Sequence, residues 1–209
     1  MTFDTEFKEA IANLPVKEKD KLLLRLLKKD LPLANRLRFE LLSTISVDER
    51  RIQMEAHIKK RVLEMTDSFY SPGYLLMDIR YLSGAINEHV AITKDKFGEA
   101  SLNLLMLNEV LALNLQKIEK APPSKSHKLY TYIVAKVFKI LLLIRKLHED
   151  CHLDFEAGLQ QLGVHIGNYH GLMKASIYNG LDVNWLLQGN IPENIADIHR
   201  DLRNRGYLR

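Results

Sequence analysis

Apolar residues recur every three or four positions along almost the whole of this 209-residue chain. The pattern starts with Phe3, Phe7, Ile11 and Leu14 and persists into the last helical stretch of the sequence. This spacing places side chains on one face of an α-helix, whereas a half-buried β-strand alternates apolar and polar residues. No useful run of such alternation occurs. The sequence therefore predicts an all-α fold without a sheet.

Capping and helix-breaking residues divide this pattern into separate helices. Ser46 and Glu49 have the spacing of a capping box, in which each side chain accepts a hydrogen bond from the other residue's backbone N–H. Pro15 and Pro32 suit first helical turns. We predict helices over residues 4–13, 15–29, 32–43, 47–68, 73–91, 99–119, 127–150, 153–162, 167–178, 182–188 and 193–204.

Short connections between these helices favour antiparallel helix pairs. No repeat consensus recurs at a fixed period, so two architectures are open: a helical-repeat-like stack and an irregular bundle. Residues 121–126 form the one linker-like stretch, Ala-Pro-Pro-Ser-Lys-Ser. We therefore expect a single all-helical domain over residues 1–209, with a joint at 121–126 that would divide it into parts 1–120 and 127–209.

Cysteine content and charge limit the setting and the class of partner. Cys151 is the single cysteine, so no intrachain disulfide forms, which fits a reducing compartment. The first residues lack the apolar stretch of a secretory signal, and the longest aliphatic run, Ile140–Ile144, is far too short to span a bilayer. We expect a cytoplasmic protein without a membrane partner. The net charge of +4 permits an anionic partner without requiring one.

A metal-binding motif is the sharpest local string. His148, Glu149 and His152 spell H-E-x-x-H and resemble the zincin metallopeptidase signature over five residues. On a helix the two imidazoles would share one face and could hold zinc while the glutamate activates a water. Asp150 departs from the family's uncharged insert. Glu88 resembles the third ligand of thermolysin-like enzymes, although it precedes the string by 60 residues.

We favour a structural interpretation of this string as the polar C-terminal end of the predicted helix 127–150. His148 and His152 would then interact favourably with the helix dipole, and Cys151 would face the core. On this interpretation the chain has no catalytic residue, metal ligand or cofactor. A metal-dependent hydrolase that uses the string is the alternative.

A lysine stripe on the predicted helix 127–150 is the second candidate site. Between Lys125 and Lys146 there are six basic residues and no acidic one. At 100° per residue, four lysines and one tyrosine fall within an arc of about 80°. Such a stripe suits the phosphates and bases of a nucleic acid, but it is also typical of any solvated helix. Its members are Lys128, Tyr132, Lys136, Lys139 and Lys146.

Four like charges on one helix face repel one another, so either a neighbouring helix or an anionic partner should offset them. The predicted helix 47–68 offers Glu49, Glu55, Glu64 and Asp67 for that role. Carboxylates packed against the stripe would support the structural explanation, whereas an open stripe would support weak, salt-sensitive binding to polyanions.

The segment Gly180–Gly189 contains Trp-Leu-Leu followed two residues later by glycine, and it resembles the closing segment of phage-repressor-type helix-turn-helix domains. Leu162-Gly163-Val164 resembles the turn of the same family. The resemblance implies a polar recognition helix after that turn, but residues 165–171 contain two glycines. From the residues alone, Trp185 and Leu186 are predicted to close the core.

No catalytic constellation is complete in this sequence. We therefore expect a non-enzymatic helical interaction or scaffold module that binds a protein partner, with nucleic acid as the alternative partner and no indication of oligomeric state. The residues predicted to be largely buried are Leu23, Leu26, Leu27, Ile79, Leu82, Ile86, Leu105, Leu111, Ile133, Val137, Leu141 and Trp185.

Overall fold

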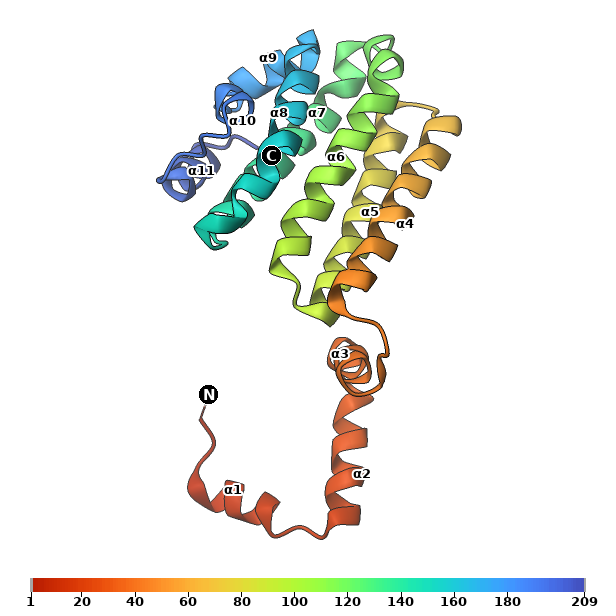
Figure 1. The fold of residues 1–209 in the computed structure, drawn as a ribbon, viewed down its shortest axis with the longest axis vertical. Helices are drawn as coiled ribbons and strands as arrows, with labels where there is room; N and C mark the ends of the chain where they lie inside the picture. The colour runs from red at the N-terminus through yellow and green to blue at the C-terminus, as the bar shows by residue number, and fades with distance from the viewer. Residues whose placement is uncertain (1, 209) are drawn as a thin grey trace. The chain divides into compact units, whose positions relative to one another are not determined.

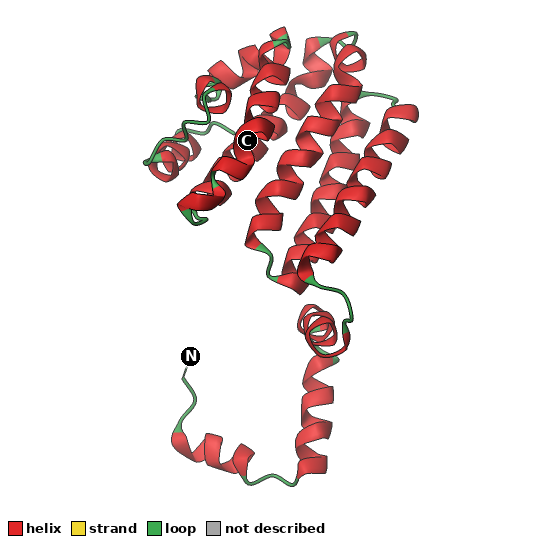
Figure 2. Ribbon diagram, in the orientation of Figure 1, coloured by secondary structure: helices red, strands yellow, loops and turns green. Residues whose placement is uncertain are grey.

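The computed structural model describes residues 2–208, and all regular structure within that range is helical (Figure 2). A 3-10 turn, η1 (Glu149–Cys151), separates α7 from α8. The prediction of an all-α fold is confirmed. The α-helices are α1 (Thr5–Ala12), α2 (Val16–Leu27), α3 (Leu31–Leu42), α4 (Val47–Asp67), α5 (Pro72–Thr93), α6 (Lys96–Glu119), α7 (Pro123–Arg145), α8 (Leu153–Gly167), α9 (His170–Tyr178), α10 (Asn184–Leu187) and α11 (Ile195–Asn204).

Side-chain caps explain why several helices begin where they do. The predicted capping box is confirmed: the Glu49 N–H donates to Ser46 Oγ at 3.1 Å, and the Ser46 N–H donates to Glu49 Oε2 at 2.7 Å. Asp4 and Asp95 accept in the same way at the starts of α1 and α6. These bonds satisfy backbone donors that the first helical turn leaves without partners.

The chain divides into two compact units. The first contains the residues up to Thr44 together with Ala91–Thr93, and the second contains Ile45–Val90 and the residues from Lys94 onward. The predicted joint at 121–126 lies inside the second unit, where α6 and α7 pack against each other. Helix α6 ends at Glu119 with Lys120 as its C-cap, and only Ala121 and Pro122 lie between this cap and the start of α7.

The second unit is an irregular helical bundle. Figure 1 shows α4, α5 and α6 side by side, and α6 also contacts α7 and α8. Helix α7 further contacts α9 and α11, which explains why it is buried on almost every side. Of the predicted core residues, Leu105 and Trp185 are partly buried. The prediction is confirmed for Ile79, Leu82, Ile86, Leu111, Ile133, Val137 and Leu141.

The first unit has no comparable core. None of the described residues of α1, α2 or α3 is buried. Leu23 and Leu26 were predicted to be buried but each is 52% exposed, and Leu27 is only partly covered. The prediction of a buried second helix was therefore wrong. The apolar stripe on α2 exists, but this unit contains no layer of side chains to cover it.

The predicted helix 127–150 was misplaced at both ends. Pro123 occupies its first turn, and the helix ends at Arg145. Proline is tolerated there because the first turn needs no backbone donor. Within residues 2–208, no helix has the length and apolar character required to cross a bilayer.

Candidate functional site

The H-E-x-x-H residues do not lie on one helix. His148 caps the 3-10 turn that contains Glu149, and His152 stands at the start of α8. The predicted helical C-terminus at this point was wrong, because α7 has already ended at Arg145. The His148 ring is 78% exposed and lies 3.2 Å from the carboxylate of Asp150. The two imidazoles therefore lack the one-turn spacing on which the zincin comparison depended.

Glu88 lies elsewhere, on α5. It lines a hollow of about 350 Å³ between α4 and α5, together with Arg50, His57 and His89. Neither His148 nor His152 belongs to this hollow. Among residues 2–208, no three histidine, cysteine or acidic side chains are placed to hold a metal ion.

The five residues of the lysine stripe do not form a continuous exposed surface. Lys128 and Lys146 are exposed near the two ends of α7, Tyr132 is half-buried, and Lys136 is only 8% exposed. Lys139 is intermediate and pairs with Glu99 of α6 at 2.8 Å. The offsetting carboxylate thus comes from α6 and not from the acids of α4 that the sequence suggested.

Lys136 lies in a polar cluster inside the bundle, which we call the Lys136 cluster: Ser83, Asn103, Tyr132 and Lys136. Lys136 Nζ donates to Asn103 Oδ1 at 3.2 Å and lies 5.6 Å from the centre of the Tyr132 ring. The Tyr132 and Ser83 hydroxyl oxygens are 3.0 Å apart. The cluster therefore connects α5, α6 and α7 through side-chain hydrogen bonds.

Burial changes the chemistry of this lysine. Removal from water, with a smaller effect from Lys139, lowers the pKa of Lys136 from 10.5 to about 8. Glu99 opposes the shift only weakly. A lysine of this kind can act as a base or a nucleophile in an enzyme, provided that substrate can reach it. Lys136 is only 8% exposed, and its hydrogen bond to Asn103 joins α7 to α6.

A second charged network joins α4 to the start of α6. Arg51 donates two hydrogen bonds to Asp95, at 2.6 and 2.9 Å, and its guanidinium lies 5.0 Å from the centre of the Phe97 ring. Asp95 also caps α6 by accepting from the Gly98 N–H at 2.7 Å. His89 Nε2 is 3.9 Å from Asp95. Burial lowers the pKa of His89 against the opposing effect of Asp95.

The segment that resembles a helix-turn-helix is arranged differently from the expectation. Leu162, Gly163 and Val164 lie within α8 and not in a turn. A Cβ at Gly163 would stand 2.9 Å from Leu187, so this glycine permits close contact between α8 and α10. Leu186 is fully buried, as predicted, and Trp185 packs edge-on against Phe138 at 6.4 Å.

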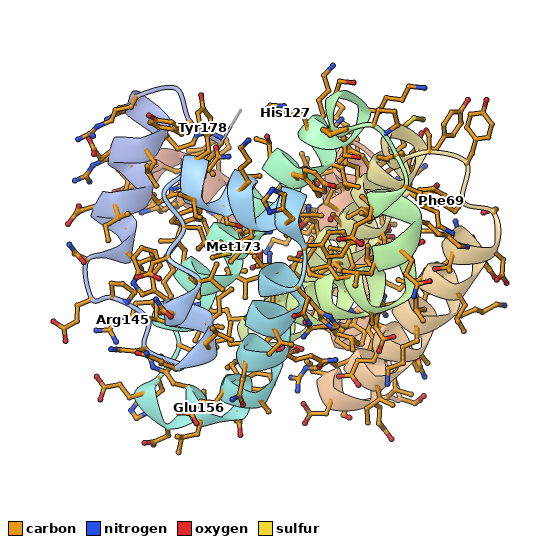
Figure 3. All side chains as sticks on the ribbon, turned by 90° about the horizontal axis from the view of Figure 1, so that it is seen from above. Phe69, His127, Arg145, Glu156, Met173 and Tyr178 are labelled. Atoms are coloured by element: carbon orange, nitrogen blue, oxygen red, sulfur yellow. The ribbon has the colours of Figure 1, made fainter. Side chains whose placement is uncertain are left out.

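An apolar hollow of about 320 Å³ is lined by residues from the start of α7 and from α9. His127 and Tyr178, which border it, lie at the same end of the bundle (Figure 3). Tyr130 also lines it, and a Cβ at Gly171 would stand 2.9 Å from the Tyr130 ring. The glycine therefore lets the tyrosine ring lie directly against the backbone of α9.

The first unit leaves eleven large apolar side chains uncovered within residues 3–42. Phe3, which precedes α1, and Phe7, which lies within it, have ring centres 5.4 Å apart. We call this set the N-terminal apolar surface. Its members, each at least 38% exposed, are Phe3, Phe7, Ile11, Val16, Leu23, Leu24, Leu26, Leu31, Leu33, Leu41 and Leu42.

Sequence reasoning found the apolar residues of this surface but assigned those of α2 to a core. Helix length gives no signal that could have corrected the assignment, because α9 and α11 have only 9 and 10 residues and yet pack against α7. Helices this short are marginal in water unless another surface packs against them.

Comparison with protein-family models, curated proteins and solved structures finds no match to this chain.

Proposed function

We propose that this protein is a non-enzymatic helical interaction module, and that its contact surface is the N-terminal apolar surface. One observation carries the proposal: residues 3–42 expose eleven large apolar side chains, ten of them on α1 to α3, and none of the described residues of these helices is buried. Exposed apolar side chains that collect in one region mark a contact site, whereas single ones scattered over a surface need no explanation. The second unit, in contrast, keeps a continuous apolar core.

Energetics support the same conclusion. Ordering the backbone of one residue costs about 1–2 kcal/mol, and burial of apolar side chains is the main term that offsets this cost. Helices α1 to α3 lack that burial within their own unit. Contact with another polypeptide would supply it. The module would therefore use α1 to α3 for docking, while the bundle from Ile45 onward provides an independently stable body.

Site-specific photo-crosslinking in living cells tests this proposal. A photoreactive amino acid replaces Leu24 on the N-terminal apolar surface and, in a matched control, Leu63 on α4. The two leucines are 59% and 54% exposed, so the probes are equally available to solvent. We expect protein adducts from position 24 and few from position 63.

The adducts are identified by mass spectrometry, which shows whether the partner is another copy of this chain or a different protein. Absence of adducts at position 24, with the protein folded and the probe incorporated, would refute the proposed function. Equal labelling at both positions would also refute it, because random collision labels any exposed leucine.

A further inference from the structure

We infer that the partner of the N-terminal apolar surface is a second copy of this chain, with α1 of each copy packed against α2 of the other. The inference rests on the proposed function and specifies its partner. Most soluble oligomers are symmetric homo-oligomers, and a two-fold axis makes each contact occur twice. The charges, the apolar area and one hollow on α2 support this pairing.

The two helices carry opposite net charge. Helix α1 with its cap has three acids and one base, a net charge of −2: Asp4, Glu6, Glu9 and Lys8. Helix α2 has four bases and two acids, a net charge of +2: Lys17, Lys19, Lys21, Arg25, Glu18 and Asp20. Helix α1 of one copy therefore complements α2 of another, whereas like helices repel. Such complementarity selects a partner and fixes its register.

A hollow of about 330 Å³ lies beside α2 and offers a place for the acidic helix. Leu14 and Leu22 give it apolar lining, and Lys21 and Arg25 outnumber Glu18 among its charged residues. Helix α1 of a second copy carries both apolar side chains and carboxylates. Its apolar side chains would contact Leu14 and Leu22, and its carboxylates would pair with Lys21 and Arg25. The α1 helix of the same chain does not pack along α2, so the hollow is open.

The apolar side chains on α1 and α2 supply much of the area that a stable dimer needs. Seven of the eleven lie on or beside these two helices and, at about half exposure, offer on the order of 700 Å² per copy, whereas a standard interface buries about 800 Å² per partner in apolar and polar area together. A membrane surface fits less well. Anionic lipids would attract α2 but repel the acidic α1.

Charge reversal in the full-length chain tests the pairing by sedimentation velocity over a concentration series. One variant, Glu6→Lys/Glu9→Lys, changes α1 from −2 to +2. The other, Lys21→Glu/Arg25→Glu, changes α2 from +2 to −2. Each variant alone then faces like charge across both α1–α2 contacts, and we expect its dimer dissociation constant to rise at least about tenfold.

A mixture of the two variants restores opposite charge at both contacts, so we expect heterodimers with an affinity within about threefold of wild type. This rescue distinguishes lost pairing from lost folding. The circular dichroism of each variant provides a further control, because the second unit keeps its helices.

Three results would overturn the inference. They are a wild type that is monomeric at all concentrations, a dimer dissociation constant that neither charge reversal changes, or a mixture of the two variants that fails to associate. If the wild type is monomeric but Leu24 crosslinks to a different protein in cells, the proposed function stands and only the second copy is wrong. Binding of monomeric wild type to vesicles of anionic phospholipid, lost in Leu24→Asp, would assign the surface to a membrane instead.

Discussion

Replacement of Lys136 by methionine should keep or raise the free energy of unfolding at neutral pH and lower it at alkaline pH. In the folded protein, burial lowers the pKa of Lys136 from 10.5 to about 8. Below pH 8 both the folded and the unfolded chain hold the proton, so the folded state bears the full cost of a buried charge. Between pH 8 and 10.5 the folded chain loses the proton while the unfolded chain keeps it, and stability therefore rises with pH.

The size of this effect follows from the pKa difference. Each factor of ten in a proton-binding constant is worth about 1.4 kcal/mol, so the wild type should gain about 3 kcal/mol between pH 7 and pH 10.5 from this group. Lys136→Met removes that gain. It also leaves Asn103 Oδ1 without the lysine donor at every pH, a cost of about 1–3 kcal/mol.

The variant should therefore equal or exceed the wild type at pH 7 and be less stable than it at pH 10.5. Urea denaturation at a series of pH values measures both free energies of unfolding. Lys128→Met is the matched control, because it removes the same charge from an exposed position on the same helix. A difference between wild type and Lys136→Met that stays constant from pH 7 to pH 10.5 would refute the reasoning.

Two further predictions concern packing. Leu141→Ala should lower the free energy of unfolding by about 2–5 kcal/mol because Leu141 is fully buried, whereas Leu26→Ala should change it by less than about 0.5 kcal/mol in the monomer. Denaturation followed by far-UV circular dichroism, which reports on the helices of both units, measures both, and equal losses would contradict the division into a core and a coreless unit. Gly98→Ala should cost about 2–4 kcal/mol, because its Cβ would stand 2.1 Å from the Asp95 carboxylate and displace the cap and its buried ion pair. Gly84→Ala, with open space around it, should instead gain up to about 1 kcal/mol, and similar effects at both glycines would show that contact at position 98 is not the cause.

Local chemistry was sufficient to predict the helices. A capping box such as Ser46 with Glu49 forms within four residues, and the spacing of apolar residues reports directly on the helical period. The buried faces of α5 and α7 were also predictable, since Ile79, Ile86 and Leu141 lie on the most apolar face of their helices. These properties depend on neighbours in sequence, which the chain itself specifies.

The candidate site depended on contacts between distant residues. Lys136 lies in what the sequence presents as a solvated stripe, yet Asn103 and Ser83 bring α6 and α5 over it and bury it. His148 and His152 match a metal-binding string by letter, but the helix that would align them ends at Arg145. Neither outcome can be derived from spacing, because spacing says nothing about which helix packs where.

The same limit explains why the sequence assigned the leucines of α2 to a core although they are exposed. The sequence by itself determined that this helix has an apolar stripe, just as it did for α7. Only the tertiary structure decided that α7 is surrounded by α6, α9 and α11, while Leu23 and Leu26 stay exposed. Amphipathic periodicity shows that a face gains free energy when it is covered, but the covering surface comes from elsewhere in the fold or from another molecule.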